Sequence, residues 1–463
     1  MTKKKTRILG FRTLSTAVAW PLVSLGLALQ DGMAGSVDTN FNPGTIFTPD
    51  IRCIIIDSNV NAVIGGPFRE IGEAERTGLA RLLTDGTLDT TFNPVVGGKI
   101  LIGGQFTTVN GVGRRCIARI NEDGSLDNGF DPGQGPDRAV QCMAVQSDGR
   151  ALIGGSFVSS YGGREGLVRL NADGTLDETF SPLLKVVGEF SDGYITAIRI
   201  QNDGKIVIGG YFKVAALLPA DWRNVPWQNV ARFAEEGSLD STFKPSSRLL
   251  SDVRAVELLN DGKIIIGGSF PKADGFPRNG IARLNGDGTL DESFDAGLGP
   301  DDRVWALSAQ NDNKILVGGF FSKFNGYLAK ACVRLEQDGL VDTTFSTGIV
   351  GDGFVAAFAH LPDRRILVGG YFTNYDGIAR TGLARLFPTN DLTLSPRFAQ
   401  VSLPASGQIR LELLSPSGRA VTILTSSNFA SWATILTVTN SSAFLQIIDT
   451  QAEGVRFYRA ELR

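Results

Sequence analysis

Short apolar runs separated by turn residues recur along most of this chain. In one copy the runs cover residues 139–146, 150–157, 166–171 and 175–180. The pair Asp148-Gly149 separates the first two runs. Asp-Gly between apolar runs is a strong hairpin signal because Gly tolerates a positive φ. The pattern therefore predicts a meander of four antiparallel strands, which we letter a to d in chain order.

The same unit occurs seven times. Strands as apolar as residues 263–268 need cover on both faces, and blades stacked around an axis supply it. The sequence therefore predicts an all-β fold with a seven-bladed β-propeller over residues 35–389. The motif Gly-Gly-x-Phe closes strand b of each copy and ends in Phe68, Phe106, Phe157, Phe212, Phe270, Phe321 and Phe372.

The order of the markers predicts how the ring closes. A Leu/Val-Asp-x-x-Phe unit forms strand d, and its first example, residues 36–41, precedes the first Gly-Gly strand. The last strand c, residues 382–386, has no such unit after it. We expect 36–41 to pair with 382–386 and complete the seventh blade, which removes an open sheet edge.

These motifs resemble the delta-60 repeat family of exported bacterial β-propeller proteins. The resemblance spans about residues 36–387. It implies an exported propeller, and it implies no activity and no catalytic residue. It is carried by Asp-Gly-x-Leu-Asp-x-x-Phe at 173–180, by Gln-x-Asp-Gly-Lys-Ile-x-Ile-Gly-Gly-x-Phe at 201–212 and by Ala-Arg-Leu-Asn at 282–285.

Two copies depart from the common length. Successive Gly-Gly pairs are 51 residues apart in three of six intervals, but the first interval is only 38 residues. Residues 95–98 stand where a full strand a belongs, so we expect blade two to lack most of its innermost strand. A loss during sequencing or gene assembly explains the same spacing. Blade four has extra residues in its links at 181–192 and 213–230. In a meander these two links lie on the same face.

That face holds the predicted ligand site. Loops on a rigid scaffold often carry recognition, and exposed Trp and Arg are frequent binding anchors. The long link of blade four offers Trp222, Arg223 and Trp227, although the two Trp side chains could instead pack on the neighbouring blade. A variable position near the start of strand a holds Arg52, Arg254 and Trp305, which could line the mouth of a channel or be indifferent solvated positions.

Charge and cysteine content narrow the classes of function. A net charge of -3 and a pI near 5.5 leave no basic surface for nucleic acid. The four cysteines align with small or apolar residues of other copies, so we expect them to be small buried hydrophobes: Cys53, Cys116, Cys142 and Cys332. The single histidine, His360, aligns with apolar residues and should be buried or at the rim, and no metal cluster or nucleophile–base pair is evident.

The turns between strands c and d contain weak calcium candidates. Oxygen side chains on alternate residues around a Gly resemble a calcium loop. A hairpin turn whose Asp side chains bind local backbone N–H groups explains them better, since other copies lose the Asn and no closing Glu follows. We expect the Arg of strand c to be structural, with Arg169 paired to Asp177. The candidates are Asn121, Asp123, Asp127, Asn171, Asp173 and Asp177.

The two ends of the chain differ from the repeats. A basic start, an apolar run and a small-x-small exit predict a signal peptide over residues 1–34, cleaved near Ala34, with no membrane span afterwards. An uncleaved anchor is the alternative. Residues 390–463, where the repeat stops, are predicted to form a small β-sandwich-like module with strands at 408–414, 421–425, 432–438, 444–449 and 457–462.

Together these observations predict a non-enzymatic binding or scaffold protein that is secreted, periplasmic or on the cell surface. Its partner would be an extracellular glycan, a peptide or an envelope component, with no cofactor other than calcium. The alternative is a propeller hydrolase or lyase acting on extracellular carbohydrate, aided by calcium. Converging carboxylates at the channel mouth would favour the enzyme, and a sparsely charged mouth would favour binding.

Overall fold

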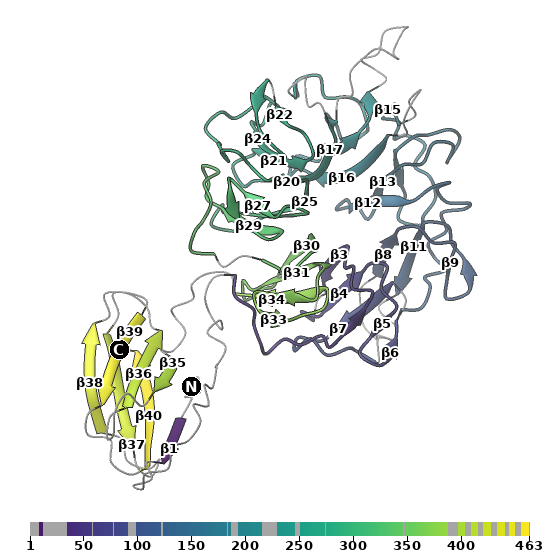
Figure 1. The fold of residues 1–463 in the computed structure, drawn as a ribbon. Coiled ribbons are helices and arrows are strands. Elements are labelled where there is room, and N and C mark those ends of the chain that lie inside the picture. Colours follow the sequence, from purple (N-terminus) through teal and green to yellow (C-terminus); the bar gives the residue numbers. More distant parts are fainter. Residues whose placement is uncertain are drawn as a thin grey trace. The chain divides into compact units, whose positions relative to one another are not determined.

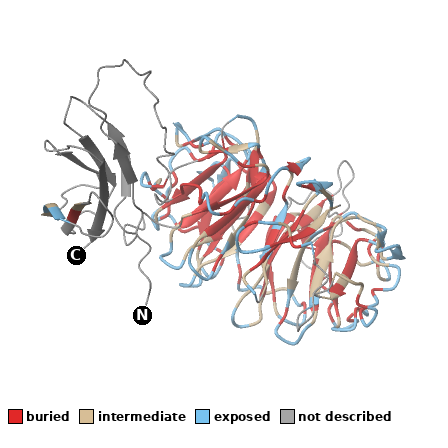
Figure 2. Cartoon of the chain, turned by 90° about the horizontal axis from the view of Figure 1, so that it is seen from below, coloured by how far each residue is buried: buried red, intermediate tan, exposed pale blue. Residues whose placement is uncertain are grey.

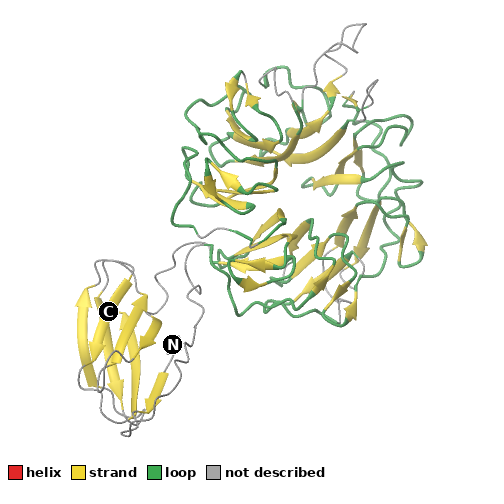
Figure 3. Ribbon diagram, viewed as in Figure 1, coloured by secondary structure: helices red, strands yellow, loops and turns green. Residues whose placement is uncertain are grey.

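The fold is described from a computed structural model, in which every described element is a strand (Figure 3). The chain divides into two compact units, Thr39–Leu386 on one hand and Met1–Asp38 with Phe387–Arg463 on the other. The described residues are 9–12, 35–57, 59–76, 78–90, 99–121, 124–182, 184–186, 193–214, 229–245, 251–273, 275–345, 348–349, 351–387, 397–402, 409–414, 420–426, 433–439, 444–449 and 455–462.

The larger unit is the predicted propeller, and six of its blades contain a three-stranded antiparallel sheet in the order a-b-c. The inner strands contact one another from blade to blade around the centre (Figure 1). The sheets are β3 (Cys53–Ile56), β4 (Ala62–Gly65), β7 (Leu79–Leu82); β12 (Val140–Val145), β13 (Ala151–Gly155), β14 (Leu167–Leu170); β16 (Tyr194–Ile200), β17 (Ile206–Tyr211), β19 (Val230–Phe233); β20 (Val253–Leu258), β21 (Ile264–Gly268), β24 (Ile281–Leu284); β25 (Val304–Ala309), β26 (Ile315–Gly319), β29 (Cys332–Leu335); and β30 (Phe354–His360), β31 (Ile366–Tyr371), β34 (Leu383–Leu386).

Strand d is shorter than predicted. In each of the first six blades it makes a single bridge to strand c, such as Leu170 to Leu176. The Arg of strand c holds it instead. Arg169 Nε donates to Asp177 Oδ2 at 2.7 Å, and the guanidinium lies 4.6 Å from the centre of the Phe180 ring. The predicted structural pair is confirmed, and it recurs as Arg119 with Asp127, Arg232 with Asp240, Arg283 with Asp291 and Arg334 with Asp342.

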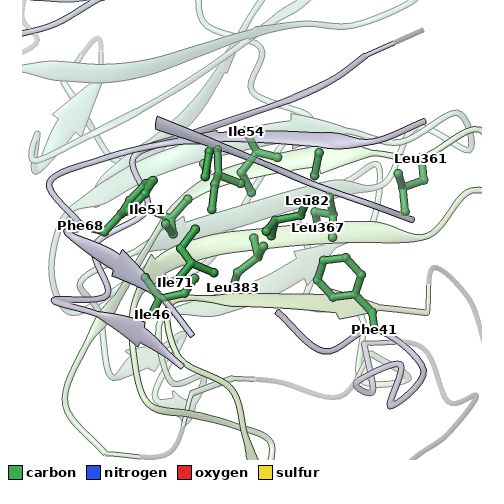
Figure 4. Close-up of a cluster of buried hydrophobic side chains, with 14 residues drawn as sticks. Phe41, Ile46, Ile51, Ile54, Phe68, Ile71, Leu82, Leu361, Leu367 and Leu383 are labelled. Carbon is green, nitrogen blue, oxygen red and sulfur yellow. The ribbon is translucent and has the colours of Figure 1, made fainter. Parts of the chain in front are cut away.

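The ring closes as predicted between the first and last blades. The Arg385 guanidinium lies 4.7 Å from the centre of the Phe41 ring, the same contact that strand d makes elsewhere. Ile51 N donates to Gly370 O at 3.0 Å, joining strand a of blade one to strand b of blade seven. Phe41, Leu383 and their neighbours form one buried cluster across this junction (Figure 4).

The described part of blade two holds two strands, and residues 95–98, where the repeat spacing predicts the loss of most of strand a, lie outside the described residues. Its strand b, β8 (Lys99–Gly103), pairs with strand c, β11 (Ile117–Asn121), and no described residue forms a strand a beside it. The other strands b are buried throughout, apart from an end residue in two of them. Buried strands of this kind are red in Figure 2. No residue of β8 is buried.

The links between strands carry short accessory strands. In blade four, β15 (Leu184–Lys185) pairs with β18 (Lys213–Val214), so the two long links of that blade meet at their bases on one face. β2 (Ile46–Phe47) pairs with β5 in blade one. The hairpins between strands b and c are β5 (Glu70–Ile71) with β6 (Ala74–Glu75), β9 (Thr108–Val109) with β10 (Val112–Gly113), β22 (Lys272–Ala273) with β23 (Phe276–Pro277), β27 (Lys323–Phe324) with β28 (Tyr327–Leu328), and β32 (Asn374–Tyr375) with β33 (Ile378–Ala379).

The smaller unit contains two antiparallel sheets. One has the order β35 (Arg397–Ser402), β36 (Ile409–Leu414), β39 (Phe444–Asp449), and the other β1 (Leu9–Arg12), β40 (Val455–Leu462), β37 (Ala420–Ser426), β38 (Ala433–Thr439). All five predicted strands of this region are present. β35 and β1 were not expected. β1 falls inside the predicted signal peptide, while the cleavage point near Ala34 lies at the limit of the described residues and stays a prediction.

The cysteines correct one expectation. All four thiols are free, and Cys116 and Cys332 are buried as predicted, with Cys142 half-buried. Cys53 is exposed, which contradicts the prediction of a buried residue. The reason is that no described residue forms a strand a in blade two, whereas strand a of one blade is normally covered by strand a of the next. No helix in the described residues is long and apolar enough to cross a membrane.

Candidate functional site

The candidate site lies at the mouth of the propeller, where each strand a begins and each strand b ends. In blades three to seven the register between these strands shifts by one residue near the start of strand a, for example between Val304 and Ala306. The residue inside the shift is the variable position predicted from the sequence, Trp305 in this blade. A bulge redirects a side chain out of the regular pleat, and two of these residues reach the next blade at the mouth: Trp305 lies against Phe354, and Thr196 donates to Val253 O at 2.7 Å.

Four aromatic side chains from blades six and seven gather at this mouth, and we call them the aromatic arc: Trp305, Phe320, Phe354 and Tyr371. Trp305 meets Phe354 edge to face with ring centres 4.4 Å apart. Phe320 lies 6.1 Å from Trp305, and Tyr371 stacks at 6.0 Å from Phe354. Phe320 and Tyr371 are each 47% exposed, so the arc presents aromatic surface to solvent.

Arg52 of blade one adds a cation to the arc. Its guanidinium lies 5.5 Å from the centre of the Trp305 ring and 5.4 Å from that of Phe354. Asp50 holds the group with two hydrogen bonds, from Nε at 2.6 Å and from the second terminal nitrogen at 2.7 Å. The Arg52 side chain is still 53% exposed. The indole N–H of Trp305 is buried and has no partner among the described residues.

A second cluster occupies the mouth at blades four and five. Arg254 pairs with Asp252 at 2.6 Å, the same relation that Arg52 has with Asp50. The Tyr194 hydroxyl donates to Asp252 at 2.9 Å, and the Tyr194 ring lies 6.2 Å from Tyr211. Burial and the nearby Asp252 carboxylate raise the pKa of Tyr194 to about 12, so this hydroxyl keeps its proton at neutral pH.

The predicted site residues separate into three groups. The structure brings Arg52 and Trp305 together and places Arg254 in the second cluster. Trp222, Arg223 and Trp227 lie outside the described residues. Sequence reasoning missed Tyr211, Phe320 and Tyr371, although each is the variable residue of a Gly-Gly-x-Phe motif and is aromatic in three of seven copies.

The calcium candidates bind their own turns. Asp173 Oδ1 accepts hydrogen bonds from the Thr175 backbone N–H at 3.0 Å and from its hydroxyl at 2.7 Å. Asn171 donates to Thr175, and Asp177 is engaged by Arg169. Asn121 likewise donates to Ser125, and Asp127 is held by Arg119, while Asp123 is outside the described residues. These contacts match the hairpin-turn interpretation.

The opposite face of the propeller carries one hydroxyl–imidazole pair. Ser308 Oγ lies 2.8 Å from His360 Nε2, and Arg199 pairs with Glu257 nearby along the inner strands. His360 is exposed, as the rim alternative predicted, and Ser308 is buried within β25. The pair gives each group a hydrogen-bond partner. A pocket of about 440 Å³ lies on this face, opposite the mouth, between the a-to-b turns of blades four and five.

The charge pattern of the mouth bears on the choice between binding and hydrolysis. Two of its carboxylates, Asp50 and Asp252, are each held by the Arg two residues further along the chain. Over the described part of the chain, no three His, Cys, Asp or Glu side chains group as metal ligands would. Asp50 and Asp252 belong to different blades, so they do not converge as the criterion for an enzyme requires, and the charged pairs also differ from the sparsely charged mouth that was the criterion for binding.

Comparison with known proteins agrees with the fold. The sequence matches the family described as "Domain of unknown function (DUF5122) beta-propeller" over residues 63–92, 98–130, 146–180, 201–243, 259–294, 310–345 and 361–392, which is more than half of the chain. This confirms a family of propeller repeats, while the delta-60 name stays a prediction. No protein with a curated description matches.

Several solved structures are similar at low identity. One is "YCF48 bound to D1 peptide", with 12% identity, a TM-score of 0.27, and coverage of 69% of this chain and 92% of that chain. Another is an exported protein of Bacteroides fragilis, with 8% identity, a TM-score of 0.24, and coverage of 70% and 90%. A third is named "Glycoside hydrolase", with 12% identity, a TM-score of 0.24, and coverage of 93% and 96%. At these TM-scores the similarity carries no argument about function.

Proposed function

Since the chain belongs to this family of β-propellers, we propose that it is a non-enzymatic binding protein that recognises a glycan at the aromatic arc. The observation that carries the proposal is the placement of Arg52 over the Trp305 and Phe354 rings, held there by Asp50. A rigid ring of blades supports these side chains, and a site on rigid elements loses little conformational entropy on binding.

The chemistry of the arc suits a sugar. The faces of pyranose rings carry C–H groups that pack on aromatic rings, and Phe320 and Tyr371 are half-exposed for such contacts. The Asp50–Arg52 pair at the arc offers an acceptor and a donor side by side, which suits neighbouring hydroxyl groups. Because Arg52 is already neutralised by Asp50, we expect neutral or weakly acidic sugars to bind better than strongly charged ones.

We also propose that the protein is exported, to the periplasm, the cell surface or the medium. This rests on the basic start, apolar run and small-residue exit of residues 1–34. Expression in a bacterial host and intact-mass measurement of the exported protein would test it. A mature chain starting near Ala34 would support export, and a full-length chain retained in the cytoplasm would contradict it.

A glycan array followed by titration calorimetry tests the binding site. We expect the Phe320→Ala/Tyr371→Ala double variant to bind at least about tenfold more weakly than wild type at an unchanged melting temperature. Tyr327→Ala is the matched control, because Tyr327 is 72% exposed but belongs to the outer hairpin of blade six. Unchanged binding by the double variant would contradict the proposal. The variant Trp222→Ala/Trp227→Ala measures what the long link of blade four adds.

A further inference from the structure

No described residue forms a strand along the inner edge of blade two, and we define this open edge by β8 together with Ile55, Gly65, Gly104 and Val145. Every residue of β8 is at least partly accessible, whereas strand b is buried in blades three and five. On either side, Ile55 of blade one is 47% exposed and Val145 of blade three is 58% exposed. These are the apolar neighbours that an inner strand of blade two would cover.

The second glycine of the Gly-Gly pair shows where strand a lies in a complete blade. A Cβ on Gly268 would lie 2.1 Å from Asp252 O, at the start of strand a in the same blade. A Cβ on Gly319 would meet Arg303 O at 2.2 Å in the same way. This glycine therefore lets the backbone of strand a approach. Gly104 is the same residue in blade two, yet the nearest described atom to its Cβ position belongs to Phe106, at 3.6 Å.

The first glycine of the pair packs against strand a of the next blade. A Cβ on Gly267 would meet side chains of the next blade's strand a, Val304 at 2.6 Å and Leu307 at 3.2 Å. A Cβ on Gly65, whose next blade is blade two, would meet only Cys53 Sγ and Gly78 O among the described residues. Gly104 of blade two and Gly65 of blade one therefore face, from opposite sides, the position that a strand a of blade two would occupy.

The chain has too few residues to fill this position itself. In blade five, the inner strand Val253–Leu258 and the turn after it take up every residue before Lys263. In blade two, only residues 95–98 separate Pro94 from Lys99. Four residues cannot supply both a strand antiparallel to β8 and the turn that leads into it.

We propose that the open edge binds an extended segment of a partner protein, which pairs antiparallel with β8 as the missing inner strand. The other blades define the chemistry of that segment: a β-branched residue, any residue, a small residue, an apolar residue, any residue and a second residue that is apolar in every blade except blade seven, which has His360. Val253–Leu258 is one example. Main-chain hydrogen bonds to an edge strand give affinity, and alternate side chains give specificity. The proposal goes beyond glycan binding and does not depend on it.

A peptide with the sequence of residues 252–260 is the probe, and a scrambled peptide is its control. We expect wild type to bind the ordered peptide at least about tenfold more tightly than the scrambled one. Alkylation of Cys53, which is an exposed residue, should slow by a similar factor when the ordered peptide is bound, because the strand would cover it. Equal binding of the two peptides, or no protection of Cys53, would overturn the proposal.

Two variants separate the open edge from unspecific peptide binding. Gly104→Val should keep the melting temperature of wild type and lose peptide binding, while Gly113→Val in the outer hairpin, also in open space, should keep both. A chain with residues 253–262 duplicated between Val96 and Gly97 should fill its own edge, losing peptide binding and Cys53 labelling. Retained peptide binding in Gly104→Val, or wild-type labelling in the duplicated chain, would count against the proposal, and neither result concerns the glycan site.

Discussion

Arg169 and Asp177 form a salt bridge of 2.7 Å in which both side chains are more than nine-tenths buried. The same Arg stacks on Phe180 and donates to the backbone oxygen of Glu235 in the next blade. One side chain therefore connects strands c and d of its own blade and joins that blade to its neighbour. This explains why an Arg stands in every strand c of an otherwise apolar repeat.

Removing one partner of this pair should destabilise the propeller strongly. Asp177→Ala leaves a buried guanidinium without its carboxylate, so we expect a loss of about 3–5 kcal/mol of unfolding free energy. Glu178→Ala is the control, because Glu178 is the exposed neighbour. Chemical denaturation followed by tryptophan fluorescence measures both. A cost for Asp177→Ala as small as that of the control would show that the pair is not structural.

The same pair makes stability depend on acid pH. Burial alone would raise the pKa of Asp177, but hydrogen bonds from Thr179 and Arg169 outweigh it and lower the pKa to about 2. The unfolded value is about 3.9, so the stabilisation is present above pH 4 and is lost as the pH falls toward 2. We expect the melting temperature of wild type to fall across this window, with a shallower slope in Asp177→Asn. A slope unchanged by the substitution would contradict this assignment.

Adding a side chain to the residue just before strand c should cost different amounts of stability in different blades. All seven copies adopt a positive φ here, with Gly in four copies and Cys116, Asn229 and Ala331 in the others. Gly78→Ala meets only a backbone oxygen at 3.5 Å, so it should cost about 1 kcal/mol from backbone strain alone. Gly166→Ala adds a contact of 2.5 Å with Val186 and should cost more. Thermal melts of the two variants give the comparison, and equal losses would show that local packing is irrelevant.

Much of the fold could be predicted because its determinants are periodic. Gly-Gly-x-Phe, the Arg of strand c and the Asp-x-x-Phe unit repeat in phase. From these repeats the blades, the closure of the ring and the Arg169–Asp177 pair could be predicted. The aromatic arc was only half predicted, because Phe320 and Tyr371 stand at positions that vary between copies and carry no periodic signal. Cys53 was misjudged since alignment compares a residue with its equivalents and ignores a missing neighbour.

The closure of the ring gives a further prediction. Phe41 is buried under Arg385 although it lies far from blade seven in sequence. Phe41→Ala should cost about 3–5 kcal/mol, as for other buried Phe residues, and should open the last blade to proteolysis. Phe47→Ala is the control, since Phe47 is 57% exposed. Limited proteolysis with mass mapping should show the first cuts near residues 382–387, and cuts confined to the opposite side of the ring would contradict the closure.

Gly268 and Gly104 hold equivalent positions in their blades, and the same substitution should cost very different amounts of stability at the two. In Gly268→Ala the new Cβ would lie 2.1 Å from Asp252 O in a fully buried strand, so the blade must shift and we expect a loss of at least about 3 kcal/mol. Gly104→Ala places the same methyl group where the nearest described atom is 3.6 Å away, so its effect should stay within about 0.5 kcal/mol. Unfolding curves of the two variants measured side by side decide the matter. If Gly104→Ala is as costly as Gly268→Ala, then blade two already holds backbone at this position and its inner edge is closed.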